Sequence, residues 1–466
     1  MSSDHRRTLV LGLDSVPPDF LFDRFAPKMP HIRELMHRGR HGVLRTIDPP
    51  ITVPAWAVMF TGVDPGSLGI YGFRHRRAHS YWDTYTPTPQ MIRFPPMWEL
   101  LSRAGRRVCV VGMPPGYPPP RVNGVYVSDF LTPSKARDFV WPTAMVPEVE
   151  KAAGGRYTFD VTFRAEDRDR IATELFEMTR NRWAVARHLW AKEKWDFFAL
   201  HEIGPDRLHH AFWKYFDPAH PKHEEHRVFT PLADEYYAML DDQIGTMLDG
   251  LDDNVTVLVV SDHGSQAMDG CFCINDWLSQ VGLLSYKGPK PAAGTPIEKA
   301  PIDWSKTQAW GAGGYYARIF FNVKGREPEG IVRPDDVIGL QQRLSEELAK
   351  VHRADGRALK PDVRAPRDIY RQVNGDSPDL MVYFGDLRCR SAGTVGHPEL
   401  FIAENDTGPD DAVHSFEGVY LLVKPEGGPA GPSVEQSILD VAPTLLTRMN
   451  EPIPPHVQGR VIPDWV

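Results

Sequence analysis

Runs of apolar residues alternate along this chain with segments whose apolar positions recur at helical spacing. The clearest run covers residues 255–260, which are all β-branched or leucine, and it predicts a strand buried on both faces of a parallel sheet. Residues 8–13 predict a first strand, and helical spacing over residues 29–36 stops near Gly39. Since strand followed by helix is the unit of an α/β fold, we expect a mostly parallel sheet flanked by helices.

The same patterns predict the other elements of this sheet domain. Further strands are expected at residues 107–111, 195–201, 379–384 and 418–423, and further helices at residues 97–105, 166–192, 234–251 and 437–449.

Residues 283–375 differ from the rest of the chain in their pattern of hydrophobic and polar positions. Within them, residues 315–323 alternate like a half-exposed strand, and residues 335–351 have the spacing of an amphipathic helix. We therefore expect a smaller α+β cap at residues 283–375, inserted into a catalytic α/β domain that is formed by residues 1–282 and 376–466.

The composition is that of a soluble globular protein. The 466 residues are 42% hydrophobic and 24% charged, and no apolar run approaches the ~18 residues that a membrane-spanning helix needs. The net charge of -8 argues against binding to nucleic acid or an anionic membrane through bulk electrostatics. Four scattered cysteines favour a reducing cytoplasm over a disulfide framework, and the pair Cys271 and Cys273 lacks the second pair that a thiolate metal site would need.

Side chains that bind metals follow several of the predicted strands. Because the carboxyl ends of parallel strands share one edge of the sheet, groups placed there can converge. Asp206 and His210 are one helical turn apart, so they face the same way and can share a metal. The full set of carboxylates and imidazoles is large enough for two divalent metals with positions left open for a substrate. Its members are Asp14, Asp206, His210, Asp262, His263 and His414, the last of which is expected in a loop that leads into a strand.

Thr52 is the candidate nucleophile. Pro54 suits the first turn of a helix, so Thr52 lies at or just before a helix N-terminus, where free N–H groups and the positive dipole end favour an anionic oxygen. The structural alternative is that Thr52 only caps the helix. Two Zn²⁺ ions and three aspartates leave a charge of about +1, which attracts a phosphoryl group, and a metal would acidify a coordinated Thr52 hydroxyl.

In these motifs the chain resembles the alkaline phosphatase superfamily. Within it, the resemblance is to the type I phosphodiesterase and nucleotide pyrophosphatase branch and to the subgroup described as predicted phosphohydrolases or phosphomutases. Besides the strand that ends at Asp14, the matching segments include residues 52–56, 261–264 and 439–444, so the likeness covers most of the chain.

The resemblance implies an alkaline-phosphatase-like fold, a set of metal ligands and a mechanism. Thr52 would attack phosphorus in line and form a phosphothreonine, which a hydroxide on the opposite side then hydrolyses. The metals would be two divalent ions, with Zn²⁺ favoured and Mn²⁺ as the alternative. One metal would be bound by Asp206, His210 and His414, and the other by Asp14, Asp262, His263 and the oxygen of Thr52.

Two positions depart from the pattern of nucleotide pyrophosphatases. Those enzymes bind a phosphoryl oxygen with an asparagine where this chain has Phe73, and they usually have a histidine in place of Leu68. Loss of a donor to a phosphoryl oxygen typically lowers the rate ~10²–10³-fold. We therefore expect Arg74 to replace the asparagine, because the arginine fork matches phosphate oxygens. The alternative is that Arg74 is a surface arginine without a role in the site. Thr52 and Trp56 exclude the formylglycine chemistry of the sulfatase and phosphonate-hydrolase relatives.

Together these observations predict a cytoplasmic, metal-dependent phosphoester hydrolase of phosphodiesterase or nucleotide pyrophosphatase type. Its substrate would be a small phosphorylated molecule such as a nucleotide or phosphodiester. A phosphomonoesterase or phosphomutase with the same site is the nearest alternative, and a non-catalytic binding protein is the alternative from another class. Aromatic residues that could stack on a base or sugar, or belong to the core, are Trp213, Trp310, Tyr315 and Tyr316.

Overall fold

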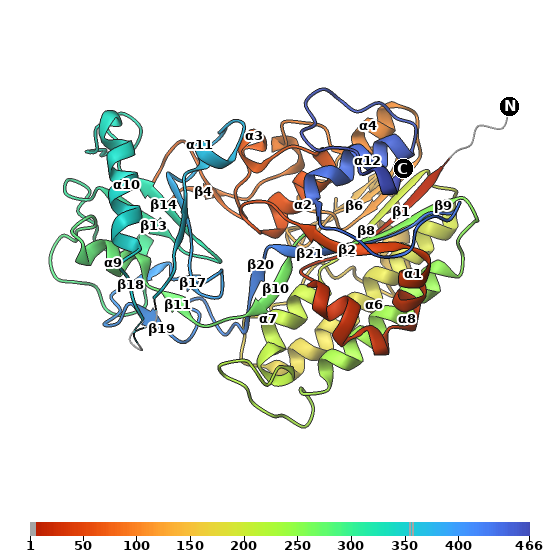
Figure 1. Cartoon of the computed structure of the whole chain (residues 1–466), viewed down its shortest axis with the longest axis horizontal. Coiled ribbons are helices and arrows are strands. Elements are labelled where there is room, and N and C mark those ends of the chain that lie inside the picture. Colours follow the sequence, from red (N-terminus) through yellow and green to blue (C-terminus); the bar gives the residue numbers. More distant parts are fainter. Residues whose placement is uncertain (1–5, 354–355, 357) are drawn as a thin grey trace. The chain divides into compact units, whose positions relative to one another are not determined.

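The computed structural model describes residues 6–353, 356 and 358–466 of the chain. The chain forms two compact units (Figure 1). Unit 1 comprises Met1–Gly72, Pro87–Ser265 and Ser415–Val466, and unit 2 comprises Phe73–Thr86 and Gln266–His414. Within the described residues, no helix combines the length and the apolar character that crossing a membrane requires.

A ten-stranded sheet forms the centre of unit 1. Strands β9, β1, β8, β5 and β6 run parallel, whereas β21 and β7 run antiparallel to their neighbours. Every residue of β1 and β9 is buried, which explains why neither strand alternates regularly between polar and apolar residues. In spatial order the strands are β22 Gly431–Pro432, β2 Arg40–Arg45, β21 Glu417–Val423, β9 Val255–Val260, β1 Arg7–Leu13, β8 Phe197–Glu202, β5 Val108–Val111, β6 Gly124–Val127 and β7 Val140–Trp141, with β23 Gln436–Ser437 also paired to β2.

Helices cover both faces of this sheet. In Figure 1, α1, α6 and α8 lie on one side of the sheet and α2, α4 and α12 lie on the other. The helices of unit 1 are α1 Pro30–Arg38, α2 Thr52–Thr61, α3 Pro65–Leu68, α4 Met97–Arg103, α5 Val146–Ala152, α6 Arg168–Lys192, α7 Gly204–Phe216, α8 Leu232–Leu248 and α12 Val441–Arg448. The fold class is therefore the predicted one, an α/β fold with a mostly parallel sheet between helices.

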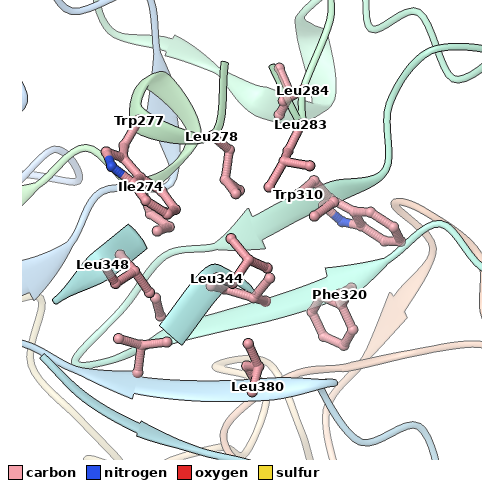
Figure 2. Close-up of a cluster of buried hydrophobic side chains, with 14 of the residues drawn as sticks. Ile274, Trp277, Leu278, Leu283, Leu284, Trp310, Phe320, Leu344, Leu348 and Leu380 are labelled. Atoms are coloured by element: carbon pink, nitrogen blue, oxygen red, sulfur yellow. The ribbon is translucent and has the colours of Figure 1, made fainter. Parts of the chain in front are cut away.

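Unit 2 is a smaller α+β structure built on an antiparallel sheet. Its order is β13 Ala309–Ala312, β14 Ala317–Phe321, β16 Leu380–Tyr383 and β15 Asp362–Arg364. Helices α9 Ile274–Gln280 and α10 Val337–Leu348 contribute apolar side chains to its core, which also includes Trp310 and Leu380 (Figure 2). The other elements are α11 Pro366–Ile369 and the short strands β3 His75–Arg76, β4 Thr84–Tyr85, β11 Cys271–Phe272, β12 Thr295–Pro296, β17 Arg390–Ser391, β18 Thr394–Val395 and β19 Phe401–Ile402. The chain crosses from one unit to the other within strand β10 Gly264–Ala267 and again within strand β20 Ala412–Ser415.

The structure corrects three details of the sequence analysis. Residues 379–384 do not return to the main sheet, because β16 pairs with β14 and β15 inside unit 2. Strand β14 is largely buried rather than half-exposed. His414 lies in β20 rather than in a loop. The first correction has a general cause, because a short apolar run reveals a buried strand but not the sheet to which it belongs.

The boundaries of the smaller unit also differ from the expected residues 283–375. Unit 2 begins at Gln266 and extends to His414, and it takes up Phe73–Thr86 from an earlier part of the chain. That early segment belongs there because its side chains pack on the core of unit 2: the ring of Tyr81 stacks on that of Trp304, with centroids 3.6 Å apart. No periodicity in the sequence could indicate a contact over so long a separation.

Candidate metal centre

The register of the central strands brings the predicted ligands together in unit 1. Strand β1 lies between β8 and β9, and all three are parallel. Gly12 is level with Val260 of β9, so two residues later Asp14 and Asp262 leave the same edge of the sheet side by side. His263 follows directly, and the three side chains are completely buried.

The donor atoms of these residues converge on one point. The Nε2 atom of His263 lies 3.3 Å from Oδ2 of Asp262, 3.8 Å from Oδ1 of Asp14 and 3.2 Å from the hydroxyl of Thr52. One ligand atom from each of Asp14, Asp262 and His263 lies within 4.8 Å of the others. Such a set of oxygens and one imidazole nitrogen has the chemistry of a Zn²⁺ or Mn²⁺ site.

The hydrogen bonding of these side chains fits a cation. Oδ1 of Asp14 and Oδ2 of Asp262, both buried, accept no hydrogen bond from any residue that the structure describes. Burial, and secondly the adjacent Asp14, raise the pKa of Asp262 well above its usual value. Nδ1 of His263 faces the carbonyl oxygen of Gly264 at 3.0 Å, an acceptor that places the ring proton on Nδ1 and leaves the Nε2 lone pair toward the carboxylates. Two adjacent buried carboxylates are stable together when a divalent ion balances their charge.

Thr52 is the first residue of α2 and is 2% exposed. The capping position is occupied by Ile51, whose side chain makes no capping hydrogen bond. The Thr52 hydroxyl faces His263 at 3.2 Å. The Thr52 oxygen therefore lies at the positive end of the helix and beside the carboxylate and imidazole cluster, and its role as a nucleophile stays a prediction.

Two residues that the sequence analysis left without a role hold Asp14 in place. Its Oδ2 accepts one hydrogen bond from Nε1 of Trp56 at 2.9 Å and one from Nε2 of His201 at 2.7 Å. Gly12 makes room for the indole, because a Cβ at this position would lie 2.5 Å from the Trp56 ring. The sequence placed His201 at the end of the predicted strand 195–201, and the structure puts it level with Gly12 of β1. Nothing in the sequence marked the Trp56 nitrogen as a donor.

Asp206 and His210 form a second pair of potential ligands in unit 1. Both belong to α7 and are at most 1% exposed, and Nε2 of His210 lies 3.3 Å from Oδ1 of Asp206. Arg207 bridges Oδ2 of Asp206, at 2.5 Å, and the carboxylate of Asp160, at 2.7 Å. The predicted facing of residues one turn apart on a helix is thus confirmed.

The neighbouring His209 has a structural role. Its two ring nitrogens face the hydroxyls of Ser265 and Tyr237, each at 2.9 Å, and burial lowers its pKa to about 3. A neutral imidazole with both nitrogens occupied by hydroxyl groups is not free to bind a metal.

The remaining predicted residues lie in unit 2. His414 is its last residue, in β20, and is followed directly by Ser415 of unit 1. Phe73 is half-buried and Arg74 is exposed. Whether His414 binds a metal and Arg74 a phosphate oxygen stays a prediction.

Unit 2 also contains a third cluster of potential metal ligands. Cys273, Asp276 and His397 bring one ligand atom each within 4.8 Å of the others. The ammonium of Lys290 lies 2.9 Å from Asp276, whose carboxylate also accepts hydrogen bonds from the backbone N–H groups of Gly396 and His397. Lys290 thus balances the charge of Asp276 in this cluster.

Carboxylates and imidazoles at the carboxyl edge of a parallel sheet can bind the divalent ions that phosphoester hydrolysis uses. Residues 8–410 match the family described as type I phosphodiesterase/nucleotide pyrophosphatase, and the chain belongs to this family of the alkaline phosphatase superfamily. Among curated protein sequences, none matches the chain.

Three similar solved structures share the fold over almost the whole chain. Human ectonucleotide pyrophosphatase/phosphodiesterase 5 is 14% identical with a TM-score of 0.55, and the murine protein of the same name is 15% identical with a TM-score of 0.56. The third is an inactive variant of the murine protein, with a threonine replaced by alanine, in complex with AMP; it is 14% identical with a TM-score of 0.56. Each comparison covers 97% of both chains.

Proposed function

We propose that this protein hydrolyses phosphodiesters or nucleotide pyrophosphates through a phosphothreonine at Thr52. The observation that carries the proposal is the Thr52 hydroxyl beside Nε2 of His263, in the cluster that includes Asp14 and Asp262. A nucleophile needs an activating group within reach, and a buried hydroxyl beside metal ligands meets this need.

Two divalent ions complete the proposed site, with Zn²⁺ favoured by the mixed carboxylate and imidazole ligands. When bound, the ions would supply positive charge that stabilises the transferring phosphoryl group and acidifies the threonine hydroxyl. Asp14, Asp262, His263 and the Thr52 oxygen would hold one ion. Asp206, His210 and His414, one carboxylate and two imidazoles, would hold the other.

The residues of the chain carry out two displacements in this proposal. The Thr52 oxygen bonds to phosphorus as the bond from phosphorus to the leaving oxygen breaks, and the leaving oxygen takes up a proton. A water oxygen then bonds to the same phosphorus and releases the Thr52 oxygen, which regains its proton. Trp56 and His201 keep Asp14 oriented throughout, and Arg74 is the proposed partner of a phosphoryl oxygen.

The similar proteins support this assignment of substrate and nucleophile. The murine protein that shares this fold was captured with AMP in a form inactivated by a threonine-to-alanine substitution. We therefore propose nucleotides or related diesters as the substrate class. The cytoplasmic location stays a prediction, supported by the four free and buried cysteines.

The test compares zinc-loaded protein on bis-p-nitrophenyl phosphate and on p-nitrophenyl phosphate. We expect the diester to be preferred, and a clear preference for the monoester would favour the phosphomonoesterase or phosphomutase alternative. Thr52→Ala should lower kcat on the order of 10³-fold or more, because no other hydroxyl replaces the nucleophile. Thr61→Ala, equally buried at the other end of α2, is the matched control and should keep its activity.

Metal analysis tests the binding-protein alternative. We expect more than one metal per wild-type chain and a clear loss in Asp262→Ala. Less than one metal per chain in the wild type, unchanged in Asp262→Ala, would favour a protein that has kept the fold without turnover.

A further inference from the structure

Unit 2 contains a cavity of about 320 Å³ in which three arginines meet aromatic rings. We call this cavity the arginine pocket. All of its lining residues belong to unit 2, so its description depends on that unit alone. Its charged lining consists of Arg74, Arg76, Arg318 and one carboxylate, that of the exposed Glu298.

The three arginines differ in how their charges are balanced. Arg76 pairs with Glu327 at 3.2 Å and with Asp376 at 2.6 Å, although its buried Nε has no hydrogen-bond partner among the described residues. The guanidinium of Arg318 donates to the backbone oxygen of Arg74 at 2.6 Å. Within the described part of the chain, neither Arg74 nor Arg318 forms an ion pair with a carboxylate.

The positive charges in the pocket affect one another. Burial, together with the charges of Arg76 and Arg74, lowers the pKa of Arg318 from its usual value. An anion placed between Arg74 and Arg318 would relieve the repulsion and accept hydrogen bonds from donors that have no carboxylate partner. Arginine forks match the oxygens of a phosphoryl group better than a single point charge does.

The other wall of the pocket is aromatic. Trp82 is 36% exposed, although most large apolar side chains of this unit are buried. Trp310 and Phe320 lie on neighbouring strands in the core of unit 2, with centroids 5.6 Å apart (Figure 2), and the Arg76 guanidinium lies over the Phe320 ring at 4.1 Å. The rings of Trp310 and Phe320 therefore pack in the core, whereas the partly exposed Trp82 ring can contact a ligand.

We propose that the arginine pocket binds a small ligand in which a phosphoryl group is attached to a planar ring. Arg74 and Arg318 hold the phosphoryl oxygens, and Trp82 packs against the ring. The cavity volume falls within the range of about 300–1,000 Å³ that is usual for small-molecule sites. Arg74 is assigned here to the arginine pocket in place of the role proposed for it beside Thr52, and the proposal does not depend on Thr52 being a nucleophile.

The test uses phenylphosphonate, which carries both groups and is not an ester. Isothermal titration of the full chain, after its metals have been removed with a chelator, should show one phenylphosphonate bound per chain. Methylphosphonate, without the ring, and benzyl alcohol, without the anion, should both bind at least several-fold more weakly. Benzoate distinguishes a phosphoryl site from a general anion site and should also bind more weakly.

Three variants assign the binding to the pocket. Arg318→Ala should weaken phenylphosphonate binding about tenfold or more, because a hydrogen bond to a charged group is lost, and Trp82→Ala should weaken it several-fold. Arg343→Ala, at an exposed arginine of α10 outside the pocket, is the control and should bind normally. Arg74→Ala changes an exposed side chain and should weaken binding even if Arg318→Ala lowers the melting temperature.

Several outcomes would overturn the proposal. Unchanged affinity in Arg74→Ala and in a folded Arg318→Ala would remove the arginines from the site. Loss of binding after chelation would place the ligand at the metal centre instead. Equal affinity for methylphosphonate and phenylphosphonate would show that no ring is recognised.

Discussion

Removal of the indole N–H of Trp56 should weaken metal binding without removing a ligand. Oδ2 of Asp14 accepts hydrogen bonds from only two described donors, Trp56 at 2.9 Å and His201 at 2.7 Å. Trp56→Phe deletes the first donor and keeps an aromatic ring in the space that Gly12 leaves open. Asp14 then keeps its charge but loses half of the hydrogen bonding that fixes its direction.

The magnitude follows from the hydrogen bond that is lost. A hydrogen bond to a charged group contributes about 1.5–3 kcal/mol, which corresponds to roughly a 10- to 100-fold change in an equilibrium constant. Substitution of residues that orient metal ligands typically costs the same, about 10- to 100-fold in metal affinity. We therefore expect Trp56→Phe to bind Zn²⁺ at least tenfold more weakly, with activity restored in excess metal.

A competitive metal titration against a chromophoric chelator measures this affinity, and activity is then followed as a function of free Zn²⁺. Trp183→Phe is the matched control, because Trp183 is equally buried and its Nε1 has no partner among the described residues. Both variants lose the same atoms, so any loss of packing is shared. Wild-type affinity in Trp56→Phe, or equal losses in the two variants, would refute the reasoning.

Three further outcomes are expected. Gly12→Ala should lower the free energy of unfolding by about 1–3 kcal/mol and also weaken Zn²⁺ binding, because its Cβ displaces the Trp56 ring; urea unfolding and metal titration measure the two effects. Chelation should lower the melting temperature, because it leaves two carboxylates adjacent in a buried site, and an unchanged melting temperature would contradict the metal centre. Burial raises the pKa of Asp129 from 3.8 to about 7, so between these values the folded state holds a proton that the unfolded chain has lost. Stability from this group therefore falls as the pH rises through that window, and Asp129→Asn should flatten the dependence of the melting temperature on pH between about pH 4 and about pH 7; the same slope in both proteins would exclude Asp129 as the cause.

The sequence predicted the strand ends and their ligands because both depend on local patterns. A fully apolar run followed by Asp262 and His263 marks a buried parallel strand and its functional edge, and the structure places Asp14 beside them. The same applies to Asp206 and His210, whose spacing alone sets them on one face of a helix. These features need no knowledge of distant contacts.

Other features depend on contacts between distant parts of the chain. Trp56 looks like core in the sequence, and only the packing of α2 on β1 turns its N–H toward Asp14. Gly264 allows a close approach of two distant segments, because a Cβ at this position would lie 2.2 Å from the backbone oxygen of Glu417. The assignment of β16 to unit 2 failed for a similar reason, since its four apolar residues would suit either sheet.

The position of β21 in the sheet affects how the protein can be made on the ribosome. Among the described residues, the strands that pair with β2 are β21, β22 and β23, which lie more than 370 residues further along the chain. Strand β9 also pairs with β21, along the edge that does not face β1. While translation proceeds, β2 and one edge of β9 therefore remain without hydrogen-bonding partners until the last tenth of the polypeptide emerges. Such late closure of a sheet favours aggregation of nascent chains, so slower translation or chaperones that cover strand edges should raise the yield of folded protein.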